Sequence, residues 1–259
     1  MKLEHPLIKH IRKEINKNRN FVGIFVGKVG TGKSYSSLKL CKEVDPTFDE
    51  SRVIFKIPDL LEMVHEKKLE PGQAVLFDEA GISASNRESY MNKFNKAMSY
   101  LLQTWRHRNI ILFVTVPSIS FIDKGIRSMF DLMIETQKVI KTRRVVQCQA
   151  KIIQHNYQLG KTYYHNLKSY TGEIMKLEIT KPPIKLINRY EKVKTAFTTE
   201  LYKQQMDDLK DSPETTEIDD MRKCPDCKNK GRWFPSKNKM GCILCGAEWK
   251  RTIYTSPGA

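Results

Sequence analysis

The chain has 259 residues and a formal net charge of +16, from 45 Lys and Arg against 29 Asp and Glu. Apolar residues make up 40% of it, which is enough for a sizeable core and excludes a wholly disordered protein. The longest apolar run, 110–116, is far short of the roughly 20 residues of a membrane-spanning helix, and the charged N-terminal stretch does not predict a secretory signal. The excess of positive charge indicates a polyanionic partner, most simply nucleic acid.

Strand-like and helix-like patterns alternate through the first half of the chain. We expect helices over 5–17, 34–43, 58–67 and 89–106, and strands over 21–26, 53–57, 74–77 and 110–116. This alternation predicts an α/β fold with a mainly parallel sheet, and the continuous apolar strands predict helices on both of its faces. Residues 130–180 instead predict a β-rich extension, followed by a helix over 186–206.

An acidic segment separates this region from the C-terminal part. Residues 207–220 contain seven acids against one Lys and few apolar side chains, a composition typical of a solvated linker. The alternative is an acidic tether that shields a basic surface when nucleic acid is absent. We therefore expect a domain over 1–206, an acidic linker over 207–220 and a small module over 221–259.

Residues 27–34 fit the phosphate-binding pattern G-x-x-x-x-G-K-[ST], between an apolar strand and a helix. Glycines let successive N–H groups point at phosphate oxygens, and the helix N-terminus adds partial positive charge. We expect Lys33 to bridge the β- and γ-phosphates and Ser34 to hold Mg²⁺. The alternative is an ordinary Gly-rich turn. The expected nucleotide-binding residues are Gly27, Lys28, Val29, Gly30, Thr31, Gly32, Lys33, Ser34 and Tyr35.

Two acidic residues, Asp78 and Glu79, directly follow the apolar run over 75–77. Asp78 is expected to fix Mg²⁺, and Glu79 to orient and deprotonate the attacking water, which favours hydrolysis over phosphoryl transfer to a small acceptor. The alternative is an exposed strand end. The strand over 110–116 is expected between or beside the other two. Its Thr115 is a candidate sensor of the γ-phosphate, or simply fills the strand end.

Basic residues follow the long helix. Arg106 and Arg108 are candidates for an arginine finger that reaches a neighbouring subunit's γ-phosphate. The alternative is a cationic helix end, which the helix dipole favours.

Four cysteines, Cys224, Cys227, Cys242 and Cys245, give the spacing C-x2-C-x14-C-x2-C. Two such pairs bring four thiolates around one Zn²⁺, and so short a module needs the metal to fold. Iron–sulfur is a minor alternative. Nine Lys or Arg against two acids over 221–259, with interleaved aromatics, suit nucleic acid or equally a protein-docking surface. Cys41 and Cys148 are expected to be buried thiols.

Together, GKVGTGKS, VLFDEA, the helix ending TWRHRN, IILFVTVPS and FIDKGIR resemble the FtsK/HerA division of P-loop ATPases. The likeness spans about residues 20–135 and is greatest to small archaeal and viral members, including genome-packaging ATPases and zonula-occludens-toxin-like phage proteins. FtsK-like proteins usually carry a Gln sensor where Thr115 stands. The resemblance implies a RecA-like sheet, a ring oligomer, often a hexamer, and DNA that is pumped or remodelled with ATP.

The primary expectation is an ATP-hydrolysing DNA motor or packaging ATPase, using ATP, Mg²⁺ and Zn²⁺, in the cytoplasm or, for a virus, the host cytoplasm. One alternative is a virion-assembly or extrusion ATPase that handles protein at a membrane. Another is an ATP-switched DNA-binding loader with little turnover. A small-molecule kinase is the remaining alternative.

Overall fold

The computed structural model describes residues 5–66, 69–78, 87–104, 108–168, 172–210, 223–224, 226–229, 231–234 and 239–249. The chain divides into two compact units, Met1–Thr198 and Thr199–Ala259. In the described part of the chain, every helix is too short or too polar to cross a lipid bilayer.

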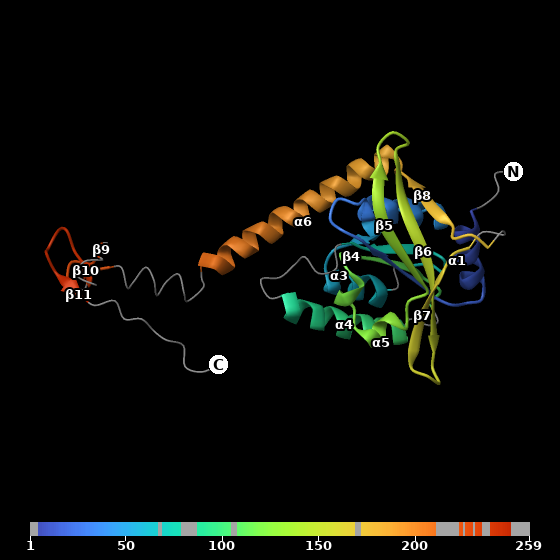
Figure 1. Cartoon of the computed structure of the whole chain (residues 1–259), viewed down its shortest axis with the longest axis horizontal. Helices are drawn as coiled ribbons and strands as arrows, with labels where there is room; N and C mark the ends of the chain where they lie inside the picture. The colour runs from blue at the N-terminus through green and yellow to red at the C-terminus, as the bar shows by residue number, and fades with distance from the viewer. Residues whose placement is uncertain are drawn as a thin grey trace. The chain divides into compact units, whose positions relative to one another are not determined.

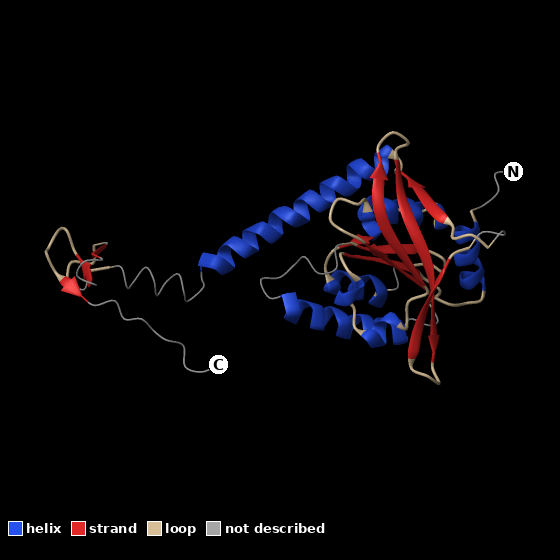
Figure 2. Ribbon diagram, in the orientation of Figure 1, coloured by secondary structure: helices blue, strands red, loops and turns tan. Residues whose placement is uncertain are grey.

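The first unit is built on one sheet, whose described strands run in the order β2-β3-β4-β1-β5-β6-β7, with β8 also paired to β6 (Figures 1 and 2). The strands from β2 to β5 are parallel, whereas β6, β7 and β8 add antiparallel pairs. Their bounds are Phe21–Val26 (β1), Val53–Ile54 (β2), Ala74–Phe77 (β3), Ile111–Val116 (β4), Leu132–Ile140 (β5), Val145–Asn156 (β6), Lys161–Asn166 (β7) and Lys176–Thr180 (β8).

Helices flank this sheet, as the fold prediction required. The α-helices are Pro6–Asn16 (α1), Lys33–Val44 (α2), Ile57–His65 (α3), Arg87–Thr104 (α4), Lys124–Arg127 (α5) and Ile184–Lys210 (α6), and short 3-10 turns cover Glu50–Arg52 and Ile119–Phe121. The α/β fold with a mostly parallel sheet is therefore confirmed. The helix expected to end at 206 continues to Lys210, into the segment expected as a linker.

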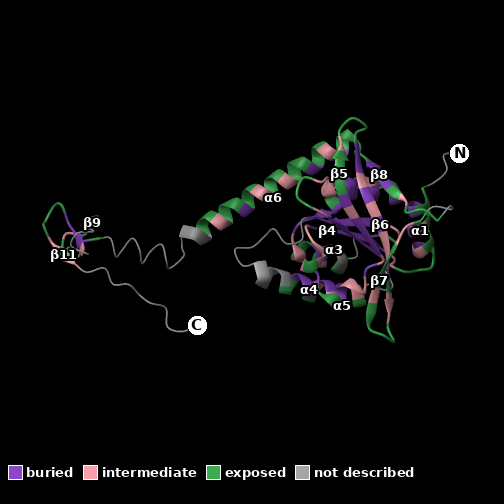
Figure 3. Cartoon of the chain, viewed as in Figure 1, coloured by how far each residue is buried: buried purple, intermediate pink, exposed green. Residues whose placement is uncertain are grey.

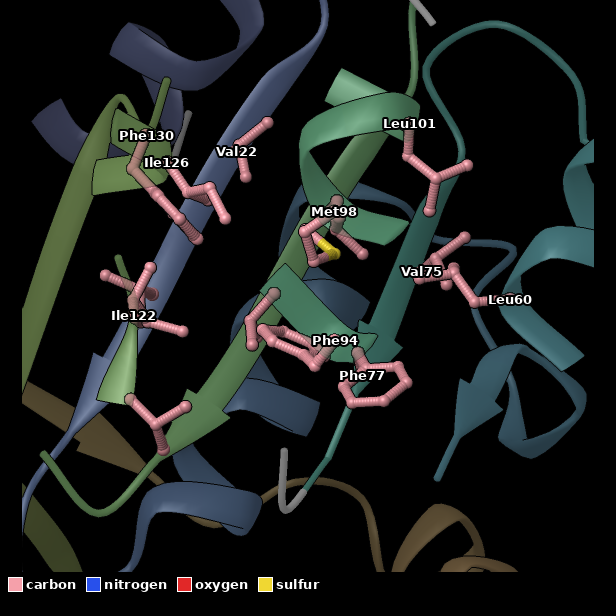
Figure 4. Close-up of a cluster of buried hydrophobic side chains, with 14 of the residues drawn as sticks. Val22, Leu60, Val75, Phe77, Phe94, Met98, Leu101, Ile122, Ile126 and Phe130 are labelled. Atoms are coloured by element: carbon pink, nitrogen blue, oxygen red, sulfur yellow. The ribbon is translucent and has the colours of Figure 1, made fainter. Parts of the chain in front are cut away.

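The central strands are buried on both faces (Figure 3). Alternate residues of β1, β3 and β4 pack against α3, α4 and α5 (Figure 4), while Phe21, Phe25 and Phe113 meet edge-on on the opposite face, where α1 and α2 contact β1. This two-sided burial explains why these strands are continuously apolar. The hydrophobic cluster between the sheet and helices α3, α4 and α5 includes Val22, Ile24, Val75, Phe77, Leu60, Phe94, Met98, Leu112, Val114 and Ile126.

Asp131 joins the start of β5 to β1. Its backbone N–H donates to the Val22 carbonyl at 2.8 Å, and its carboxylate accepts the Val22 N–H at 2.8 Å. Burial raises the pKa of Asp131 from 3.8 to about 6. Burial thus makes ionisation of Asp131 less favourable than that of an exposed Asp, and the carboxyl ionises near pH 6 in the folded state.

The second unit contains a small antiparallel sheet, ordered β11-β10-β9, with bounds Arg232–Phe234 (β9), Lys239–Gly241 (β10) and Glu248–Trp249 (β11). Cys224 and Cys227 precede β9, and Cys242 and Cys245 lie in the turn between β10 and β11. The chain divides into its two compact units between residues 198 and 199, inside α6. This division does not test the domain boundaries expected at 206/207 and 220/221, which remain predictions.

The raised pKa of Asp131 makes stability depend on pH. The pKa of Asp131 is higher in the folded than in the unfolded chain, so protonated Asp131 favours the folded state. This contribution to the free energy of unfolding is complete below about pH 4 and is lost as pH rises through about 6. Asp131→Asn keeps an acceptor for Val22 N–H and removes the ionisation. We expect the free energy of unfolding of Asp131→Asn, relative to that of the parent, to rise by about 2 kcal/mol between pH 4 and pH 7.5.

Urea unfolding followed by circular dichroism at the two pH values measures this difference. Asp59→Asn, at an exposed position of α3, is the matched control and should show no such change. A pH-independent offset for Asp131→Asn would contradict the prediction.

Candidate functional site

The phosphate-binding loop lies between β1 and α2, at the carboxyl ends of the parallel strands. Gly27 and Gly32 have φ of 149° and 91°, a region that favours glycine. A Cβ at Gly27 would collide with Thr136 Oγ1, and one at Gly32 would lie 2.7 Å from Val146 Cγ2. The β5–β6 hairpin therefore packs so closely on the loop that both positions require glycine.

Lys33 lies over the same loop. Its ammonium donates to the carbonyls of Gly27 at 2.8 Å and Lys28 at 2.9 Å. The Thr31 hydroxyl lies 2.7 Å from the Thr136 hydroxyl and donates to the Lys28 carbonyl at 2.7 Å, which ties the loop to β5. Lys33, the residue expected to bind phosphate, is thus held against a loop that Thr31 and Thr136 tie to β5.

Asp78 is the centre of the candidate site. It follows β3, is fully buried, and its Oδ1 accepts hydrogen bonds from the Ser34 hydroxyl at 3.0 Å and the Thr115 hydroxyl at 2.7 Å. The strand carrying Thr115, β4, lies between β1 and β3, one of the two arrangements expected. Ser34, Asp78 and Thr115 are therefore brought together from three separate elements.

The other carboxylate oxygen of Asp78 is bound by α6. The Tyr190 hydroxyl donates to Oδ2 at 2.5 Å, and Lys194 Nζ lies 3.6 Å from the same atom. Tyr190 is 1% exposed and its ring is 6.3 Å from that of Tyr35, while the Tyr35 hydroxyl donates to Glu191. Thus α6 covers the site, and its first turns supply a hydroxyl and a cation.

Sequence reasoning missed Tyr190, Lys194 and Thr136. A weak signal for the first two exists, since Tyr190, Lys194 and Phe197 recur at helical spacing and share one face of α6. Phe197 stacks on Phe55 with ring centroids 4.8 Å apart. Nothing in the pattern, however, indicates that this face covers a buried carboxylate.

Three predicted residues are not part of the described contacts at this site. Glu79 and Arg106 lie outside the described residues. Arg108 precedes β4 at the amino end of the parallel strands, opposite the edge that holds Ser34 and Asp78. Arg108 is therefore remote from its own chain's loop, and a finger role for it requires a second subunit.

The residues fit a nucleotide phosphate and a divalent cation. The hydroxyl of Ser34 and the carboxylate of Asp78 are hard oxygen donors 3.0 Å apart, the type that Mg²⁺ prefers. Beside them lie the ammonium of Lys33 and a Gly-rich backbone at a helix N-terminus, which suit phosphate oxygens. The arrangement can hold a polyphosphate and its cation at one buried edge of the sheet.

The four cysteines form a second candidate site, in the second unit. Their Sγ atoms all lie within 4.8 Å of one another, with Cys224 to Cys245 at 3.4 Å and Cys227 to Cys242 at 3.5 Å. In the sequence, Cys224 pairs with Cys227 and Cys242 with Cys245. The residue after each pair, Lys228 or Gly246, has a positive φ, and its N–H donates at 3.0 Å to the carbonyl of the first cysteine of that pair. The two pairs are thus folded alike, as metal-binding turns are.

One of these thiols accepts a hydrogen bond from a neighbouring side chain. The Asn229 side-chain amide donates to Cys227 Sγ at 3.5 Å and lowers the pKa of that thiol to about 6. The thiolate is the metal-binding form. Cys41 and Cys148, in contrast, are buried as expected, and burial raises the pKa of Cys148 to about 12.

No protein-family model and no curated protein matches the chain. Similar solved structures include the N-terminal domain of zonular occludens toxin from Neisseria meningitidis, at 14% identity over 58% of this chain and 96% of that chain, with a TM-score of 0.35.

Another is the genome packaging NTPase B204 from Sulfolobus turreted icosahedral virus 2 in complex with ATP-γS, at 12% identity over 56% of this chain and 96% of that chain, with a TM-score of 0.32. The DnaC helicase loader matches at 16% identity over 45% of this chain and 76% of that chain, with a TM-score of 0.26. Both groups that the motifs resemble are thus represented.

The contact from Tyr190 to Asp78 should contribute measurably to stability. Tyr190→Phe removes the hydroxyl from a fully buried carboxylate oxygen, and we expect a loss of about 2 kcal/mol in the free energy of unfolding. Tyr100→Phe, at a 66% exposed position, is the control. Equal stability of the two variants in urea unfolding would contradict the role assigned to Tyr190.

Proposed function

We propose that the chain is a Mg²⁺-dependent ATPase that acts on DNA. The observation that carries the proposal is the convergence of the phosphate-binding loop, Ser34 and the buried Asp78 at one edge of the sheet. Asp78 is fully buried, and hydrogen bonds from Ser34, Thr115 and Tyr190 compensate for its removal from water. Binding a cation beside a phosphate loop is the role that its neighbours support.

In this proposal each side chain has a separate task. Lys33 neutralises the β- and γ-phosphates, and the loop N–H groups and the N-terminus of α2 hold their oxygens. Ser34 and Asp78 hold the Mg²⁺ ion, which supplies charge neutralisation at the phosphates. Glu79 takes the proton of the attacking water. Thr115, hydrogen-bonded to Asp78, is the proposed sensor of the γ-phosphate.

DNA is the proposed partner because of charge and of one exposed hairpin. The net charge is +16. The β6–β7 hairpin exposes Tyr157 (84%), Tyr163 (41%) and Tyr164 (37%) beside the cation of Lys161. Exposed aromatic rings beside a cation suit stacking on bases and contact with phosphates. A subunit ring supplying Arg106 or Arg108 in trans, and a cytoplasmic location, complete the proposal.

ATP turnover without DNA, with single-stranded DNA and with double-stranded DNA tests this function. We expect stimulation by one DNA form, and a loss of turnover of about a hundredfold or more in Lys33→Ala and Glu79→Gln. Lys39→Ala, on the same helix and paired with Glu43, is the matched control and should stay active. Turnover that is indifferent to both DNA forms would contradict the DNA role and favour a protein substrate.

The four cysteines are proposed to hold one structural Zn²⁺. A tetrahedral ion with bonds of about 2.3 Å places sulfurs roughly 3.8 Å apart, within the limits of the cluster. All four positions are then filled by protein, so the ion stabilises the fold and does not bind substrate.

Metal analysis of the purified chain tests this assignment. We expect one zinc per chain, lost in Cys242→Ala and kept in Cys148→Ala, because Cys148 is buried in the first unit, outside the cluster. Zinc that remains in Cys242→Ala, or iron in its place, would contradict it.

A further inference from the structure

Lys194 on α6 places a positive charge at Asp78, beside the atoms proposed to hold Mg²⁺. Its Nζ lies 3.6 Å from Asp78 Oδ2. The Ser34 hydroxyl donates to the other oxygen of the same carboxylate, Oδ1, at 3.0 Å. Ser34 and Asp78 have tasks in the proposed function, whereas Lys194 has none.

Two side chains one helical turn apart connect α6 to this carboxylate. The Tyr190 hydroxyl donates to Oδ2 at 2.5 Å, and the Lys194 ammonium lies 5.5 Å from the centroid of the Tyr190 ring. Residues four apart in a helix lie on the same face. One face of α6 thus supplies Oδ2 with both a hydroxyl and a cation.

The ammonium of Lys194 can leave Asp78 without disturbing the core. From residue 184 to residue 197, the buried side chains of α6 are those of Leu186, Tyr190 and Phe197. The side chain of Lys194, in contrast, is 22% exposed. A long Lys side chain in such a position can keep its stem packed while its charge turns to water.

A magnesium ion and the Lys194 ammonium would compete for the same carboxylate. Mg²⁺ binds an oxygen directly, at about 2.0–2.1 Å, or through one of the waters that it keeps. An ion held by Ser34 and Asp78 Oδ1 therefore lies within a few ångström of Oδ2. Like charges that close repel strongly in a buried site, so binding of either cation weakens binding of the other.

We propose that Lys194 is a built-in competitor of Mg²⁺ at Asp78, an assignment that rests on the proposed function. Lys194 neutralises the buried carboxylate until the ion enters with ATP, and then withdraws toward solvent. Its pairing with Asp78 stabilises the unliganded fold and lowers the affinity for Mg²⁺, because the ion must displace the ammonium. Lys194 thereby sets how readily the site is loaded.

The gain in ATP affinity that Mg²⁺ provides measures this competition. Calorimetry with a non-hydrolysable ATP analogue, in Mg²⁺ and in EDTA, gives the gain for each variant. Lys194→Met keeps an unbranched stem and loses the charge, and we expect its gain to be about tenfold larger than that of the parent. Lys194→Arg keeps the charge and should keep the parent's gain.

Lys192→Met is the matched control, because it removes the same charge from an exposed position of the same helix. It should leave the gain at the parent's value. An unchanged gain in Lys194→Met would overturn the competition alone. If binding by Lys194→Met is then weaker in both conditions, Lys194 is instead a phosphate ligand.

Thermal unfolding separates competition from a merely structural role. We expect Lys194→Met to unfold at a lower temperature than the parent without ligand, and the difference to shrink with Mg²⁺ and the analogue, because the ion then neutralises Asp78. An equal difference in both conditions would overturn the competition. A parent chain that binds the analogue in neither condition, or gains nothing from Mg²⁺, would overturn the proposed function, and the competition with it.

Discussion

The carboxylate of Asp78 is the interaction on which the rest of the site depends. Removing a charge from water is costly, and Asp78 is fully buried. Its two oxygens are compensated by hydroxyls of Ser34, Thr115 and Tyr190 and by the ammonium of Lys194. These groups come from α2, β4 and α6, so satisfying one charge fixes the positions of three elements around the loop.

The second constraint is the close support of the loop by the β5–β6 hairpin. Thr136 and Val146 lie where side chains at Gly27 and Gly32 would be. The antiparallel extension of the sheet is therefore not a peripheral addition. It backs the loop on the side away from Asp78, while α6 covers the Asp78 side. At the carboxyl ends of the parallel strands, the loop is therefore bordered by α6, which supplies the charged Lys194, and by the β5–β6 hairpin, which supplies the apolar Val146.

Much of this could be predicted from local pattern. The bounds of β1 and β3 agree with the apolar runs over 21–26 and 74–77, because strands buried on both faces are continuously apolar. The cysteine spacing likewise predicted a four-thiol cluster. In contrast, Tyr190 lies 112 residues from Asp78, and only tertiary packing places them together. The sequence likewise does not predict the register of β6 against β5, which brings Val146 against Gly32.

The most direct test of the central claim is the Mg²⁺ dependence of ATP binding in the parent chain and in Asp78→Asn. If Asp78 and Ser34 share the ion, Mg²⁺ should tighten ATP binding to the parent by about tenfold or more, about 1.4 kcal/mol. In Asp78→Asn that gain should disappear, with Mg²⁺-free binding retained through Lys33 and the loop. An undiminished gain in Asp78→Asn would contradict the account.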